Sequence, residues 1–490
     1  MPVSRIVALW TQTQRAIIPA YHDHVIQVRN DGFFNAYGQV FINGSLVFPT
    51  DIKYVIEIDC EGGTAGSVIL KKTTSFEEDF IAYFHVESVI QDFLETDNEE
   101  FYLGNTHQAS SINSIHLIQN FSKNKANLRR FTFLVRCEFV VDNVTYSTQN
   151  FTMPDNLGAN RYYNQDYYFW NAVADKLDGE TFQHITDYYQ TDSSSKTLTT
   201  FPTGTGAPTQ KIQKTQHHTV GFFCGGHQDH STDSFQLADM SSVKVTLFNA
   251  SGVQVEQNTL LNSDANGGAA PVANQFFSTS GNATRGQNGL LYLGTGTANL
   301  AGAGAITSSN MEIGGTYKVE FLQSDGTTQA YEPLTFEITD DDCKGFETIR
   351  LAWLNTLGTW DYFNFSKLST QTYTSKRATY KQNYGHETNN TFDGWGANTH
   401  LGGQQVFNNT VKQTIEANTD FITEEEAAFL KGCFTSPKVQ WQTLNSRSQF
   451  KFVPVVVKEK DYVVRTSAND KLIQYVIELE VGHDYRVQRG

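Results

Sequence analysis

The segment that most constrains the fold is an aromatic-rich stretch, residues 350–380. Two runs of β-forming residues flank the sequence Asn-Thr-Leu-Gly, a combination typical of a tight turn between antiparallel strands. We predict a hairpin here, and its members are Trp353, Asn355, Gly358, Trp360, Asp361 and Phe363. The segment contains no titratable pair that resembles an active site. We therefore interpret the hairpin as a packing and assembly element.

The composition of the whole chain indicates a mainly β protein. Its 490 residues include 35 Phe and 22 Tyr, which favour strands. Thr, Asn and Gly supply turns between them. A chain of this length is too long for one hydrophobic core and divides into several domains. We predict several β-sandwich domains of immunoglobulin-like or jelly-roll-like type, with a few short helices.

Changes in composition along the chain predict four ranges. Residues 1–155 form an N-terminal β-sandwich, and residues 156–234 form a Tyr-rich connector with an extended arm or loop. An immunoglobulin-like sandwich spans residues 235–341 and contains a Gly/Asn-rich insertion at 262–308. A C-terminal β domain at 342–490 carries the aromatic hairpin.

Four local patterns predict individual elements. Thr423 and Glu426 have the spacing of a capping box, which favours a helix at 423–432 in the C-terminal domain. Apolar residues recur on one helical face within residues 86–95, so we expect a second short helix there. We predict strands at 114–119 and 130–141, and a short helix around 170–176.

Charge and cysteine content constrain the partners and the compartment. The formal net charge is −16 and the isoelectric point is about 5.2. A surface of this sign repels phosphate backbones, so we expect no nucleic-acid partner. The five cysteines have no framework spacing, which predicts free buried thiols in a reducing compartment. They are Cys60, Cys137, Cys224, Cys343 and Cys433. The sequence shows no signal peptide and no membrane span, so we expect synthesis in a cytoplasm.

One segment contains residues that can bind a metal. The candidates are His217, His218, Cys224, His227 and His230, all within fourteen residues of one another. Cys and His are the ligands that zinc prefers, but this spacing matches no established zinc motif. Residues 219–223 have the pattern of a strand, which gives the flanking histidines a structural interpretation. We predict no metal and no cofactor, and retain these five residues as the metal candidates.

The sequence lacks the common catalytic signatures. It contains no Gly-x-Ser-x-Gly elbow, no His-Glu-x-x-His motif and no P-loop. We therefore expect no catalytic residues and no enzyme activity, and rank a hydrolase on a β scaffold last. The aromatic segment 162–170 and Trp395 could stack on sugar rings. A buried or interface aromatic patch is the alternative interpretation of the same segment.

Three stretches carry a resemblance to a known family. They are residues 34–94, which begin Phe-Asn-Ala-Tyr; residues 350–363; and residues 418–475, which include Ser436 and Pro437 after the predicted helix. Together they resemble β-rich virion structural proteins of tailed bacteriophages, of the tail or baseplate type. The resemblance implies no catalytic residues.

The resemblance also implies a function and a location. It implies a subunit that assembles with copies of itself and with other virion proteins, located in the virion tail after synthesis in the host cytoplasm. Two alternatives remain open. The first is a carbohydrate- or receptor-binding sandwich protein of the virion with a glycan contact, and the second is a neck or capsid-associated protein.

Overall fold

The computed structural model gives a mainly β fold, as the composition predicts. It describes residues 5–10, 17–31, 33–42, 45–60, 67–74, 80–99, 114–119, 121–148, 163–173, 188, 195–204, 206–223, 240–261, 290–323, 325–340, 346–382, 385–387, 395–397, 403–444, 447, 449–459, 462 and 473–489. The chain forms two compact units. Unit 1 comprises Met1–Ala207, Lys214–Glu337 and Thr356–Trp360, and unit 2 comprises Pro208–Gln213, Ile338–Asn355 and Asp361–Gly490. This division is coarser than the four ranges predicted from the sequence, and those ranges remain predictions.

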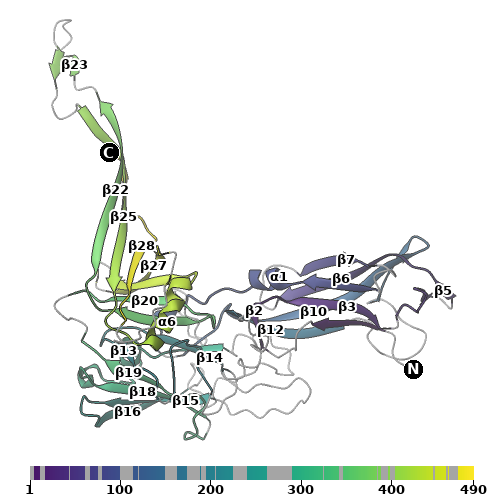
Figure 1. The fold of residues 1–490 in the computed structure, drawn as a ribbon, viewed down its shortest axis with the longest axis horizontal. Coiled ribbons are helices and arrows are strands. Elements are labelled where there is room, and N and C mark those ends of the chain that lie inside the picture. Colours follow the sequence, from purple (N-terminus) through teal and green to yellow (C-terminus); the bar gives the residue numbers. More distant parts are fainter. Residues whose placement is uncertain are drawn as a thin grey trace. The chain divides into compact units, whose positions relative to one another are not determined.

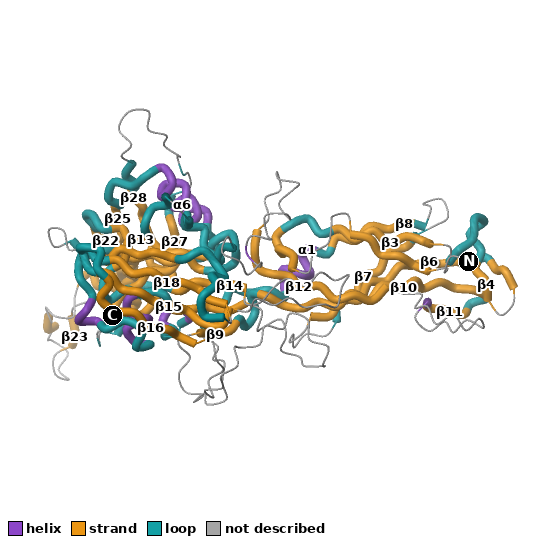
Figure 2. The backbone as a smooth tube through the Cα atoms, turned by 90° about the horizontal axis from the view of Figure 1, so that it is seen from below, coloured by secondary structure: helices purple, strands orange, loops and turns teal. Residues whose placement is uncertain are grey.

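The first part of unit 1 is a β-sandwich. One layer has the strand order β2 (Ile17–Tyr21), β12 (Tyr163–Val173), β10 (Leu128–Val141), β6 (Thr50–Cys60) and β7 (Val68–Thr73), with β11 (Val144–Ser147) paired to β10. The other layer is β1 (Arg5–Trp10), β3 (Val25–Asp31) and β8 (Ile81–His85). Figure 2 shows β3 and β8 lying over β7 and β10. A small hairpin of β4 (Val40–Ile42) and β5 (Ser45–Val47) and the helix α1 (Glu87–Asp92) complete this part.

The alternating sequence of β10 explains why the two layers pack together. Side chains at every second position face inward, and Phe131, Phe133 and Val135 are fully buried. They share a core with Ile26 and Val28 of β3. Each such side chain contributes about 1.5–3 kcal/mol through burial of apolar surface. The period of two along β10 therefore determines which face of the sheet meets the second layer.

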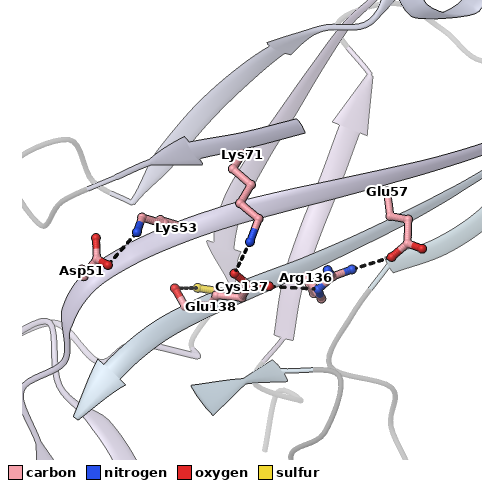
Figure 3. A network of polar contacts seen from close by, with 7 residues as sticks. All are labelled: Asp51, Lys53, Glu57, Lys71, Arg136, Cys137 and Glu138. Atoms are coloured by element: carbon pink, nitrogen blue, oxygen red, sulfur yellow. Dashed lines mark hydrogen bonds and ion pairs between the residues drawn. The ribbon is translucent and has the colours of Figure 1, made fainter. Parts of the chain in front are cut away.

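The opposite face of β10 carries charged residues that pair across strands. Lys71 of β7 lies 2.9 Å from Glu138, and the Arg136 guanidinium lies 2.8 Å from Glu57 of β6 (Figure 3). Partial burial disfavours the charged form of Glu138, but Lys71 and Arg136 outweigh this effect and lower the pKa of its carboxyl. These pairs keep the outward face polar, in agreement with the alternation of β10.

The second part of unit 1 contains two further sheets. One has the order β19 (Leu334–Ile338), β18 (Thr316–Gln323), β15 (Met240–Phe248) and β16 (Gln254–Leu261). The other is β14 (Thr219–Phe223), β17 (Leu290–Gly294) and β9 (Phe121–Lys123). The rings of Phe222 in β14 and Phe321 in β18 are 5.4 Å apart, so the two sheets share a core. Short helical elements flank them: η2 (Ile115–Leu117), α5 (Thr297–Gly302) and η4 (Ser308–Asn310).

Unit 2 is built on one long antiparallel sheet. Its order is β21 (Trp360–Phe365), β20 (Ile349–Leu354), β26 (Val439–Leu444), β27 (Phe450–Val457), β28 (Val476–Val481), β25 (Gly403–Asn418) and β22 (Thr370–Gln382). The short strand β29 (Arg486–Arg489) also pairs with β25. A small pair, β23 (Gly385–Glu387) and β24 (Trp395–Ala397), the strand β13 (Gln210–Ile212) and the helix α6 (Glu424–Thr435) complete the unit.

Several predicted elements are confirmed. Helix α6 begins with the predicted capping box, in which the Thr423 side chain accepts from the Glu426 N–H and the Glu426 carboxylate accepts from the Thr423 N–H. Helix α1 and strand β10 occur where the apolar patterns place them. Cys60, Cys137 and Cys433 are buried, as predicted, and burial raises the pKa of the Cys137 and Cys433 thiols. Cys224 and Cys343 lie outside the described residues.

Three predicted elements are wrong. Residues 115–117 form a 3-10 turn where we predicted a strand. The helix expected at 170–176 is the end of strand β12 over residues 170–173, where Trp170 pairs with Leu128 and Pro19 and Val173 pairs with Tyr21. Residues 174–176 lie outside the described residues. The predicted insertion at 262–308 ends earlier, since β17 and α5 occupy its last part. The Gly-rich flanks of β17 concealed its apolar Leu-Leu-Tyr-Leu sequence. Residues 262–289 lie outside the described residues.

Candidate assembly site

The turn of the predicted hairpin, Thr356–Trp360, belongs to unit 1 and is enclosed there. Gly358 has a φ of +76°, a conformation that favours glycine. A Cβ atom at this position would lie 2.2 Å from the backbone oxygen of Asn171. The Asn127 side-chain amide donates a hydrogen bond to the Gly358 carbonyl. The backbone of the turn therefore fits only with glycine at position 358.

Two buried tryptophans, Trp170 of β12 and Trp360 at the end of the turn, anchor the turn through their ring nitrogens. The Trp170 ring nitrogen donates a 2.7 Å hydrogen bond to the Leu357 carbonyl. The Trp360 ring nitrogen donates a 2.9 Å hydrogen bond to the Asp97 carbonyl, and the His116 ring contacts the Trp360 ring edge to face at 4.6 Å. Both indoles are almost completely buried. Each combines a large apolar burial with a satisfied polar N–H, which is the arrangement a buried tryptophan requires.

A buried polar cluster centred on Asp97 lies beneath Trp360. One Asp97 carboxylate oxygen accepts from the backbone N–H groups of Lys125 and Ala126 at 3.0 and 2.9 Å. The other accepts from the Tyr292 hydroxyl at 2.9 Å, and the Asn127 amide donates to the same hydroxyl at 2.8 Å. Burial raises the pKa of Asp97 to about 6, although these hydrogen bonds act to lower it. With 4% exposure and both oxygens occupied, Asp97 stabilises the turn and is closed to a substrate.

The remaining predicted hairpin residues lie in unit 2. Trp353 on β20 is fully buried and packs against Phe429 of α6, with ring centroids 4.9 Å apart. Asn355 and Asp361 are buried, and Phe363 is half-buried against Phe365. The structure therefore uses these side chains for internal packing.

The histidines that we considered as metal ligands are partly described. His218 is buried, its Nδ1 lies 2.6 Å from the Thr295 hydroxyl, and its ring contacts Phe336 edge to face. His217 is also buried. Cys224, His227 and His230 lie outside the described residues. Within the described residues, no group of three or more His, Cys, Asp or Glu side chains is placed to hold a metal ion.

The aromatic segment considered for sugar stacking is largely internal. Tyr167, Tyr168, Phe169 and Trp170 are buried in strand β12. A ring whose faces are covered by protein cannot stack on a sugar, so these four residues offer no glycan platform. Trp395 lies in β24, and its side chain is outside the described part of the structure.

A second aromatic hairpin, formed by β22 and β25, is exposed. We call residues 370–382 and 403–412, together with β29, the β-arm. All residues of β22 are exposed except Gln382, which is half-buried. Among the described strands, β22 is the last of its sheet and pairs with β25 alone. Figure 1 shows the two strands running side by side beyond the other strands of their sheet, with β23 at the far end.

The end of the β-arm has little support from its own sheet. β28 pairs with β25 over residues 414–418 and β29 over residues 408–411. Beyond that point, residues 379–382 pair only with residues 403–406 among the described strands. Two-stranded ribbons are marginally stable in water unless something packs on them. The free edge of β22 also presents unpaired backbone donors and acceptors to a neighbouring strand.

The β-arm exposes aromatic and cationic side chains. Tyr380 and Phe407 are 40% and 51% exposed, with rings 6.4 Å apart. Tyr373 is exposed in the same way and contacts Tyr485 at 4.8 Å.

The sequence contains a signal for this arm: a long run of strand formers that is polar on both faces, followed by a Gly/Asn-rich loop and a second polar run. The predicted β-rich stretch 350–380 covers most of β22, but we did not predict that β22 and β25 form an exposed arm, because both faces of these strands are polar.

Comparisons with known proteins add no family to this description. No protein-family model matches the chain, and no curated protein matches it. Among the helices that the structure describes, none combines the length and the apolar character needed to cross a membrane.

Proposed function

We propose that this protein is a structural subunit of a tailed-bacteriophage virion, located in the tail or baseplate. It works by protein–protein contact with copies of itself and with other virion proteins. The resemblance of residues 34–94, 350–363 and 418–475 supports the virion assignment. The fold is compatible with a structural role, because it consists of several separate β-sheets, and the first of them share a hydrophobic core.

The observation that carries the proposal is the exposed β-arm. Soluble proteins usually shorten, cover or charge their edge strands, because a free edge invites pairing with another chain. Here a 13-residue edge strand is exposed along its length and carries tyrosines beside the cations Lys376, Arg377 and Lys381, so it opposes pairing with a like strand but leaves room for a partner of opposite charge. Such a strand is suited to a protein whose edge is covered after assembly.

The titratable groups of the buried cluster support a structural role over a catalytic one. A raised carboxyl pKa is common in active sites, but it also arises in closed polar clusters. Asp97 has its oxygens occupied by backbone and tyrosine donors, and it lies beneath a buried tryptophan. We assign it to the stability of the turn.

The test is to locate the chain in an intact particle. An antibody raised against the purified chain is applied to particles of the source phage and imaged by immunogold electron microscopy. We expect gold at the tail or its distal end. Gold at the neck or on the capsid would instead support the alternative positions. Particles that carry no label, and in which mass spectrometry finds no peptide of this chain, would contradict the proposal.

A further inference from the structure

The β-arm is basic on a chain that is strongly acidic. Its described residues include Lys376, Arg377, Lys381, Lys412 and Arg486, and neither residues 370–382 nor residues 403–412 contain a carboxylate. The chain as a whole has a net charge of −16. Basic residues gathered on one exposed ribbon of such a chain mark a surface that attracts an acidic partner.

The cations near the end of the β-arm are available to such a partner. Lys412 is paired with Glu480. Within the described residues, Lys376, Arg377 and Lys381 are exposed and form no ion pair. The loop between the two strands adds Glu387 and Asp393 to the sequence, but these two carboxylates do not balance the arm. A contact with the arm therefore depends on charge as well as on the exposed tyrosines.

The same chain carries an acidic surface, whose charge is opposite to that of the β-arm. Residues 51–100 contain thirteen carboxylates and only three lysines, namely Lys53, Lys71 and Lys72. Among these carboxylates, Asp97 is buried, Asp51, Glu57 and Glu99 form ion pairs, and Glu61, Glu77, Glu78, Asp79 and Glu100 lie outside the described residues. The others are Asp59, Glu87, Asp92 and Glu95. In and after helix α1, Asp92 and Glu95 are exposed and make no ion pair with a described residue. We call Asp92 and Glu95 the α1 acidic surface; Glu87, at the start of α1, is half-buried and lies 3.9 Å from the His85 ring.

We infer that the β-arm of one copy binds the α1 acidic surface of a second copy of this chain. This inference rests on the proposed structural function and names the surfaces that it uses. The contact joins two different surfaces, so each copy can bind one neighbour through its β-arm and a second neighbour through its α1 acidic surface. Repetition of such a heterologous contact builds rings when it closes and filaments when it does not.

Charge favours a second copy over nucleic acid as the occupant. Lysine, arginine and tyrosine on a ribbon can also bind phosphate backbones and stack on bases. The chain's own acidic surface, however, repels a polyanion that approaches the arm and attracts the arm of another copy. Nucleic-acid binding therefore becomes an outcome that the experiment must distinguish.

Charge reversal on either side tests the contact in the full-length chain. The arm variant is Arg377→Glu with Lys381→Glu, and the α1 variant is Asp92→Lys with Glu95→Lys. The matched control is Lys196→Glu with Lys214→Glu, which reverses two exposed lysines elsewhere and changes the net charge as the arm variant does. All six positions are exposed, so we expect wild-type melting temperatures and circular dichroism spectra. Sedimentation velocity at low and at high salt measures self-association.

We expect wild-type chains to associate at low salt and to dissociate as salt screens the contact. The arm variant and the α1 variant should each associate at least about tenfold more weakly, while the control associates like wild type. An equimolar mixture of the two reversed variants should recover association, because each reversed surface then faces its opposite charge.

Other results would overturn the inference in distinct ways. Monomeric wild-type protein at low salt would contradict self-association, as would unchanged association of either reversed variant. Retention of a labelled oligonucleotide by wild type and its loss in the arm variant would assign the arm to nucleic acid. If self-association fails while gold labels the phage tail, the proposed function stands and this contact does not. If the particles carry no label, the proposed function itself fails.

Discussion

Two aromatic hairpins of this chain are used in opposite ways. The turn at Thr356–Trp360 buries its tryptophan and satisfies the indole N–H within unit 1. The β-arm of unit 2 leaves Tyr380 and Phe407 exposed on strands with one free edge. Aromatic content alone therefore does not identify an interaction surface. Aromatic rings can form an interaction surface only where the protein's own core leaves them exposed. The assembly role predicted for the first hairpin is therefore better suited to the second.

The largest effect is expected from Trp360→Ala. It removes a buried indole and its hydrogen bond to the Asp97 carbonyl, and should lower the free energy of unfolding by about 3–5 kcal/mol. Urea denaturation followed by circular dichroism measures the change. Trp360→Phe keeps most of the ring and loses only the N–H, so it should cost clearly less. Equal stability of wild type and Trp360→Ala would show that the turn is not a packed part of unit 1.

A pair of glycine substitutions compares the two hairpins directly. Gly358 and Gly403 both have positive φ angles, +76° and +86°. A Cβ on Gly358 meets the Asn171 backbone, whereas a Cβ on Gly403 meets nothing within 4 Å. Gly358→Ala should therefore cost about 3 kcal/mol or more, from overpacking added to backbone strain. Gly403→Ala should cost about 1 kcal/mol from the backbone alone. Similar melting temperatures for the two variants would contradict this assignment.

The cluster beneath Trp360 predicts a pH dependence that the β-arm lacks. The pKa of Asp97 is about 6 in the folded protein and 3.8 for an ordinary aspartate. Between these values the folded state holds a proton that the unfolded state has released, so stability falls as pH rises from about 4 to about 6. The loss amounts to about 3 kcal/mol, since each pKa unit corresponds to about 1.4 kcal/mol.

Asp97→Asn separates this contribution from those of other titrating groups. The variant holds no titrating proton at position 97, so its stability relative to wild type should increase as pH rises through this range. Chemical denaturation at several pH values gives the difference. The comparison with wild type also cancels the contribution of His24. Burial lowers the pKa of His24 to about 4, so its titration increases the stability of the folded protein as pH rises. A difference that stays constant across the range would show that Asp97 is already ionised in the folded protein.

Local signals in the sequence predict much of the fold. The period of two along β10 and the capping box of α6 depend on residues close together in the chain, so they can be recognised without the structure. The Asn-Thr-Leu-Gly turn falls in the same class. These signals predict strands, a helix and a turn, whereas the mainly β fold class was predicted from the composition.

The environment of each hairpin could not be predicted in the same way. Asp97 lies 263 residues before Trp360, and Trp170 lies 187 residues before Leu357. No local pattern connects positions so far apart, so the sequence did not reveal that unit 1 encloses the turn. The β-arm escaped prediction for a different reason, because its strands lack the apolar face that normally identifies a buried strand.

The smallest effect on stability, and the clearest separation between the two hairpins, is expected for Tyr380→Ala combined with Phe407→Ala. Both rings are exposed and contact each other rather than a core, so the free energy of unfolding should change by less than about 0.5 kcal/mol. Self-association at low salt should nevertheless weaken, because the rings supply apolar area at the contact that we infer for the β-arm. The charge reversals and this apolar pair then report on the same surface through different forces. If the double variant associates like wild type, the contact depends on the charged residues alone. If it loses much stability, the two rings belong to a core and the distinction between the two hairpins fails.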